Sequence, residues 1–151
     1  MKYVKVEWNP ALPGFQLDAS VYLNELPRLS EDLPPGAREF ATAPDHYRFR
    51  AARCVKDLEL AGIHVPVGKG ERLVLRFAPN EWKHEEGLCL VYEGVTHFSV
   101  ASDREIDWTE VETVVLDEIT PAPGGCVHEI ALTDSTIVVR CADLRATWGG
   151  C

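Results

Sequence analysis

From Cys54 onward the chain consists of short apolar runs separated by turn residues, and this pattern limits the fold more than any other feature. The first runs are CVKDLELAGIHV, RLVLRF and LCLVYEGVTHFSV, and VETVVLDEI follows an acidic stretch. Two more runs span residues 126–132 and 136–141, and LRATW adds a last short one. Runs of β-prone residues bounded by Gly, Pro and polar turns are typical of strands. We therefore predict a mainly β protein, an antiparallel sandwich or curled barrel of about seven to nine strands.

The N-terminal third has a different pattern. Residues 3–8 alternate between polar and apolar, which predicts a strand, and prolines then interrupt the run. A short helix follows, capped by Asp18 or Ser20 and ended or kinked by Pro27. Residues 34–40 predict a second short helical segment that opens on two prolines. One or two N-terminal helices are therefore expected beside the strands, and an α+β fold is the alternative.

The size of the chain predicts one domain over residues 1–151, because 151 residues can form a single apolar core. No apolar run approaches the ~20 residues that cross a bilayer, and the start resembles no signal peptide, so we expect a cytoplasmic protein. The five cysteines are then expected to be reduced thiols. Cys54 and Cys89 lie in strand-like runs as small buried hydrophobes, whereas Cys151 is expected to be exposed.

The acidic surplus is confined to one half of the chain. The net charge is −9, yet residues 1–75 hold 10 acids and 10 bases, while residues 76–151 hold 14 acids and 5 bases. An acidic field repels nucleic acid and attracts basic partners. Solubility alone is the simpler explanation of the same charge.

Residues 126–141 combine metal-ligating side chains with a hairpin pattern. A two-residue turn at Asp134 and Ser135 places Glu129 opposite Arg140 and leaves one largely apolar face, with Cys141 directly across from His128. Zinc ligands usually come in C-x₂₋₄-C pairs, which this chain lacks. We expect no metal and no cofactor, with His128 donating a hydrogen bond to a backbone carbonyl; the metal candidates would be Cys126, His128 and Cys141.

The stretch SDREIDWTEVETVVLDE (residues 102–118) holds seven acids and one base. Its first acids have the spacing of a calcium loop, but Trp108 stands where an EF-hand requires glycine, and Val114 where it requires a bidentate acid. The stretch is either a solvated connector or an acidic docking surface with an aromatic anchor. Trp82, in the loop NEWKHEEG, either takes part in recognition or folds back on the sheet. The candidate partner-binding residues are Asp103, Glu105, Asp107, Trp108, Glu110, Glu112 and Trp82.

Other sites find little support in the sequence. Residues 46–56 interleave basic and aromatic side chains, which can hold a nucleic-acid backbone, but the overall acidity opposes this, and we expect no nucleic-acid or membrane partner. No nucleophile elbow, P-loop, dinucleotide fingerprint or deaminase pattern is present, so no catalytic residue is predicted. A pocket in a barrel mouth lined by His97, His128 or Glu118 is one alternative, for a small-ligand binder or an enzyme. A symmetric homo-oligomer is another.

The C-terminal third, HFSV…VVLDEI…HEIALTDSTIVVRCADLRATW, resembles the β-rich ends of small uncharacterised bacterial proteins, some of which serve as immunity partners of polymorphic toxins. The resemblance covers about 50 residues and rests on pattern rather than on a defining motif. It implies a small, acidic, cytosolic and non-catalytic protein that neutralises a toxin by tight binding. Together with the charge, it favours a protein-binding domain for a basic partner.

Overall fold

The computed structural model describes residues 1–68 and 71–151, which contain ten strands and two helices. The strands are β1 (Lys5–Asn9), β2 (Gly14–Asp18), β3 (Glu59–His64), β4 (Leu73–Ala78), β5 (Leu88–Glu93), β6 (His97–Ala101), β7 (Val114–Ala122), β8 (Gly125–Leu132), β9 (Thr136–Cys141) and β10 (Asp143–Trp148). The helices are α1 (Ser20–Asp32) and α2 (Pro35–Ala41).

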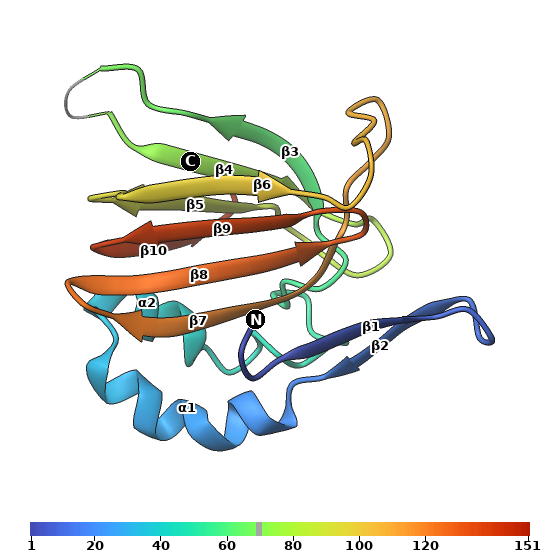
Figure 1. Ribbon diagram of the computed structural model, residues 1–151, viewed down its shortest axis with the longest axis horizontal. Helices are drawn as coiled ribbons and strands as arrows, with labels where there is room; N and C mark the ends of the chain where they lie inside the picture. Colours follow the sequence, from blue (N-terminus) through green and yellow to red (C-terminus); the bar gives the residue numbers. More distant parts are fainter. Residues whose placement is uncertain (69–70) are drawn as a thin grey trace.

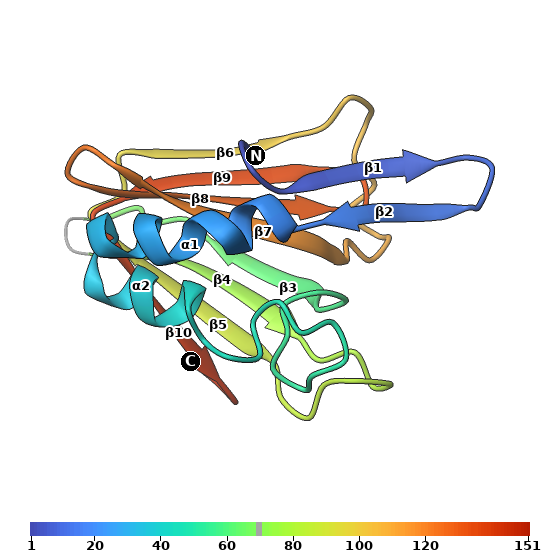
Figure 2. The ribbon, with the colours of Figure 1, turned by 90° about the horizontal axis from the view of Figure 1, so that it is seen from below.

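Eight of the strands form two antiparallel sheets of four, packed face to face as a sandwich (Figures 1 and 2). The strand orders are β10-β5-β4-β3 and β6-β9-β8-β7. A backbone bridge connects Glu59 of β3 to Thr113, the residue before β7, and so links the two sheets at one corner. The predicted mainly β architecture with N-terminal helices is confirmed. Inward-facing side chains of both sheets and of the helices form one apolar cluster.

Helix α1 closes one side of the sandwich along β7 (Figure 2). The Asp18 carboxylate accepts the Ser20 N–H at 2.8 Å, and Tyr22, Leu26 and Leu29 are buried at helical spacing. Of the two effects predicted for Pro27, an end or a kink, the end is wrong, because α1 continues through it to Asp32. Burial of the apolar face on both sides of the proline offsets its missing hydrogen bond.

Helix α2 packs against β10, and an acid from that strand caps it. The Asp143 carboxylate accepts the N–H groups of Gly36 at 3.1 Å and of Ala37 at 2.9 Å, where a helix N-terminus favours negative charge. A side chain at position 36 would have its Cβ 1.9 Å from the Leu144 carbonyl oxygen, so the helix approaches β10 this closely only with glycine.

The hairpin of β1 and β2 extends beyond the end of the sandwich (Figure 1). Trp8 of β1 packs edge-on against Phe15 of β2, with ring centroids 5.2 Å apart. The sequence predicts β1 but not β2, because two prolines precede the second strand and a glycine begins it. This strand brings the number above the predicted range.

The β8–β9 hairpin has its predicted faces but a different register. Leu132 N–H donates to the Ser135 carbonyl at 2.8 Å, so the turn lies one residue earlier than predicted. Arg140 therefore faces Val127 rather than Glu129, and Cys141 faces Cys126 rather than His128. The partners shift by two residues, which keeps every side chain on its face. The predicted apolar face, which is buried, consists of His128, Ile130, Leu132, Ile137, Val139 and Cys141.

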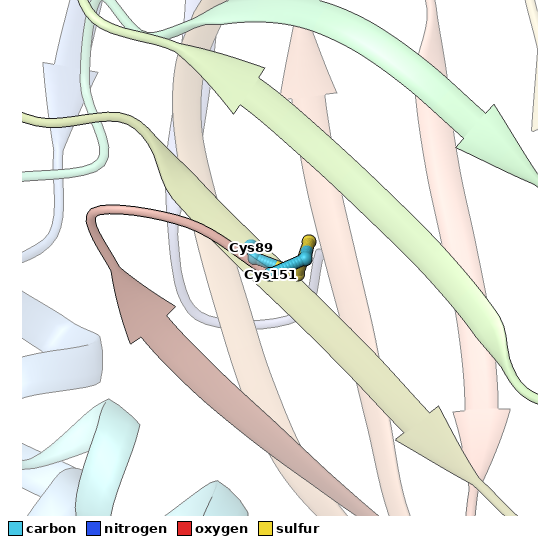
Figure 3. Close-up of a disulfide and its surroundings, with 2 residues drawn as sticks. All are labelled: Cys89 and Cys151. Carbon is cyan, nitrogen blue, oxygen red and sulfur yellow. A yellow bond between two sulfur atoms is a disulfide. The ribbon is translucent and has the colours of Figure 1, made fainter.

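The expectation of five reduced cysteines is also wrong. Cys89 on β5 and Cys151 at the end of the chain form a disulfide, with Cα atoms 5.4 Å apart (Figure 3). The chain turns back after β10, the strand paired with β5, and so brings the two residues together. Cys54, Cys126 and Cys141 are free and buried. No helix in the described ranges has the length and apolar character that crossing a membrane requires.

Candidate functional site

Residues 102–113 link β6 to β7 and form the acidic connector at one end of the sandwich (orange, Figure 1). The side chains of Asp103, Glu105, Asp107 and Glu110 are exposed, and Trp108 is 59% exposed. Four of the predicted carboxylates and the predicted aromatic anchor therefore lie together on the surface.

Hydrogen bonds and an ion pair hold this connector in place. Arg104, the only base in its sequence, pairs with Asp134 of the β8–β9 turn at 2.6 Å rather than with the exposed acids of the connector. Asp107 accepts hydrogen bonds from the Thr109 hydroxyl at 2.6 Å and the Thr109 N–H at 2.9 Å. These bonds lower the pKa of Asp107, so its charge persists in mildly acidic solution.

Glu112 does not belong to this surface. It is only 6% exposed, and its carboxylate accepts the Ser135 hydroxyl at 3.0 Å and the Asp134 N–H at 3.3 Å. Thr133 N–H donates to the Thr113 carbonyl beside it. These contacts hold the tip of the β8–β9 hairpin, and they explain why its turn lies one residue earlier than the local sequence predicts.

A groove runs between the acidic connector and β3. It has a volume of about 310 Å³ and is lined by residues 60–63, Trp108, Glu110 and the edge of Glu112. β3 is the last strand of its sheet, and its Leu60 N–H donates to the Glu112 carbonyl at 2.8 Å. Beyond that bond, no strand of the described part of the chain pairs with the outer edge of β3. The groove therefore combines an open strand edge with an exposed indole and an acid.

Trp82 projects into solvent rather than folding back on the sheet. The indole is 94% exposed at the tip of the β4–β5 loop, whereas His84 in the same loop is buried and bonds the Cys54 carbonyl through Nε2 at 2.8 Å. This loop and the acidic connector lie at the same end of the sandwich but apart (Figure 2). The structure therefore does not bring Trp82 into the groove beside Trp108.

A polar network crosses the core between the two sheets. Asp117 of β7 contacts His46 Nε2 at 2.8 Å and His128 Nε2 at 2.9 Å, and each imidazole bonds a different carboxylate oxygen. His128 Nδ1 lies 2.9 Å from the Tyr92 hydroxyl on the opposite sheet. His46 Nδ1 lies 2.9 Å from the Phe40 carbonyl of α2. The network ties both sheets and the second helix to one carboxylate.

The hydrogen-bond partners of each group indicate how protons are shared in this network. His46 lies between two acceptors, because its Nδ1 contacts the Phe40 carbonyl and its Nε2 contacts the Asp117 carboxylate. His128 donates to Asp117 and accepts from Tyr92, whose pKa burial raises well above its usual value. Burial alone would raise the pKa of Asp117, but the charge on His46 and the hydrogen bonds from both imidazoles lower it below its ordinary value.

These groups have the chemistry of a catalytic relay but no access to a substrate. His46, Asp117 and His128 are each 1% exposed, and Tyr92 is fully buried. Within the described residues, the space beside Asp117 and His128 amounts to about 10 Å³, close to the volume for one water. The network therefore serves to hold the sheets together.

The pocket considered for a small-ligand binder or enzyme does not form from the residues predicted for it. His97 is exposed on β6 and lies 3.2 Å from the Ser99 hydroxyl. Glu118 is buried on the opposite face of β7 from Asp117 and accepts the N–H groups of residues 2–4 at 2.6–2.8 Å. His128 is buried and bonds Asp117 and Tyr92 instead of the backbone carbonyl we expected.

Of the three candidate metal ligands, only the two cysteines contact each other. Cys126 and Cys141 lie opposite each other with sulfur atoms 3.6 Å apart, and this contact raises the pKa of the Cys126 thiol. Both ring nitrogens of His128 have other partners. In residues 1–68 and 71–151, no three His, Cys, Asp or Glu side chains form a group that could hold a metal.

Sequence reasoning missed the buried network. Asp117 and Glu118 interrupt the apolar run VVLDEI, and two adjacent acids inside a strand signal a buried polar contact. Both residues are among the seven acids that we assigned to the acidic stretch of residues 102–118. His46 and Tyr92 carry no comparable local signal, because their contacts depend on residues 71 and 36 positions away.

Comparisons with protein-family models, with curated protein sequences and with solved structures gave no match to this chain. Its function must therefore be inferred from its own residues.

Proposed function

We propose that this protein is a non-catalytic protein-binding domain that holds a basic partner through the acidic connector, in the manner of an immunity-type inhibitor. The observation that carries the proposal is the set of four exposed carboxylates around an exposed tryptophan, Trp108. A desolvated aromatic side chain surrounded by charge is typical of interface hot spots. The acids steer a basic partner toward it.

The interior supports binding at the surface over chemistry in a pocket. Its imidazoles and carboxylates bond to one another or to the backbone, and the described part of the chain contains no buried side-chain polar atom without a partner. A ligand-binding site usually presents convergent polar groups in a cavity of hundreds of Å³. The space beside Asp117 and His128 is far smaller.

The test is recovery of a partner from the native host, followed by charge reversal. We expect a basic protein to bind, and the triple variant Glu105→Lys, Asp107→Lys, Glu110→Lys to bind it at least about tenfold more weakly. The matched control reverses Glu31 and Asp32 of α1 and Glu39 of α2, which gives the same net charge with the changes on the helices. Equal losses in both variants, or no loss in the first, would contradict the proposal. A toxin gene beside this gene would identify the partner class.

A cytoplasmic location remains part of this proposal, and the Cys89–Cys151 disulfide gives it a direct check. Structural disulfides persist in oxidising compartments and are rare in the cytosol. Trapping thiols with an alkylating reagent at the moment of cell lysis reports the state of the bond. Free Cys89 and Cys151 in the cell would support a cytosolic location, and a complete disulfide would oppose it.

A further inference from the structure

We propose that the basic partner binds as an extended strand, added to the outer edge of β3 inside the groove beside the acidic connector. This inference rests on the proposed function and specifies how the partner is held. It concerns the groove lined by residues 60–63, Trp108 and Glu110.

The backbone of β3 provides the first part of the argument. Residues 62–64 pair with β4 on one side, and β3 is the last strand of its sheet. Within residues 1–68 and 71–151, its other edge is paired only at its start, where Leu60 N–H donates to the Glu112 carbonyl and Glu59 bridges Thr113. An open strand edge presents alternate N–H and C=O groups to a peptide, which is the basis of recognition by strand addition.

The pairing of β3 with β4 is irregular beside the groove. The register of β3 against β4 shifts between Leu60 and Gly62, so Ala61 is an extra residue in the strand. Such a bulge bends the strand locally. An added Cβ at Gly62 would meet nothing within 4 Å, which shows open space on the face of β3 to which this position points.

Charge selects the chemistry of the incoming strand. The exposed acids Glu105, Asp107 and Glu110 lie on the connector that forms one wall of the groove, and the connector's only base, Arg104, is paired with Asp134. Arg76 of β4, an exposed base, lies opposite Gly62 of β3 in the sheet but does not line the groove. A strand rich in lysine or arginine therefore matches the charge of this wall, and Trp108 offers a face for cation–π contact.

The probe is an octapeptide with capped ends, in which every second residue is lysine and the others are threonine or valine. Its binding is measured with the intact protein. Two derivatives carry N-methyl groups on alternate residues, one on the odd and one on the even positions. Only every second amide of an added strand faces β3. We expect one derivative to bind at least about tenfold more weakly than the parent peptide and the other to bind like the parent. Amide hydrogen exchange of residues 61–64 is expected to slow when the peptide binds.

Each other outcome overturns the inference. If both methylated peptides bind like the parent and residues 61–64 gain no protection, the peptide is held by charge alone. In that case, the proposed function still holds if reversal of Glu105, Asp107 and Glu110 abolishes binding of the host partner. Absence of any peptide binding at low salt also overturns strand addition. A dimer by light scattering, with residues 61–64 protected without peptide, would show that a second copy of the chain occupies the edge.

Discussion

At the scale of single residues, Asp117 is the polar side chain on which the core depends most. Among the described residues, it is the carboxylate that contacts two imidazoles between the sheets, one through each of its oxygens. A buried charge that loses its partner is strongly destabilising. We therefore predict that Asp117→Asn lowers the free energy of unfolding by about 3–5 kcal/mol. Urea denaturation measures this, with the exposed Asp103→Asn as control; a loss similar to that of the control would contradict the assigned ion pair.

The lowered pKa of Asp117 predicts that the free energy of unfolding depends on pH. The pKa of Asp117 is lowered in the folded state, so the unfolded chain takes up its proton first as pH falls below about 4. The stability that this group contributes is therefore complete near pH 5 and is lost progressively as pH falls further. We expect the difference in unfolding free energy between the wild type and Asp117→Asn to shrink between pH 5 and pH 2. A constant difference over this range would show that the pKa is not lowered.

At the scale of elements, Gly36 fixes how closely α2 lies on β10. We predict that Gly36→Ala costs about 1–3 kcal/mol, because the new Cβ would meet a backbone oxygen that cannot move away without disturbing the sheet. Gly62→Ala is the matched control, since its Cβ meets nothing within 4 Å, and it is expected to change stability by less than about 0.5 kcal/mol. Thermal unfolding of the two variants makes the comparison, and equal midpoints would contradict the close contact.

The sequence predicts those elements that are determined by the local pattern of polar and apolar residues. Strands with alternating side chains, such as β8 and β9, and the face each presents to the core follow from the sequence alone. The β8–β9 register does not, because Glu112 and Thr113 hold the turn from a distant segment. The passage of α1 through Pro27 and the existence of β2 likewise depend on tertiary packing. For the candidate site, the sequence indicated which residues are acidic and aromatic, but burial of Glu112 and the groove along β3 required the structure.

At the scale of the whole molecule, the Cys89–Cys151 disulfide closes the chain over 62 residues. A cross-link of that span restricts the unfolded chain and is expected to stabilise the fold by up to about 4 kcal/mol. We predict that Cys151→Ser, and the wild type in reductant, unfold at the same lower urea concentration. The oxidised, denatured protein should show the three free thiols of Cys54, Cys126 and Cys141. Five thiols, or a midpoint unaffected by reductant, would contradict the bond.

The measurement that tests the central claim most directly is the rate of association with the recovered basic partner as a function of salt. Steering by Glu105, Asp107 and Glu110 predicts that the rate falls steeply as ionic strength rises from about 20 to 300 mM. Reversal of these three acids should lower the rate at low salt and flatten its salt dependence, whereas reversal of Glu31, Asp32 and Glu39 should leave most of both unchanged. Parallel salt dependences for the wild type and both triple variants would contradict binding through the acidic connector.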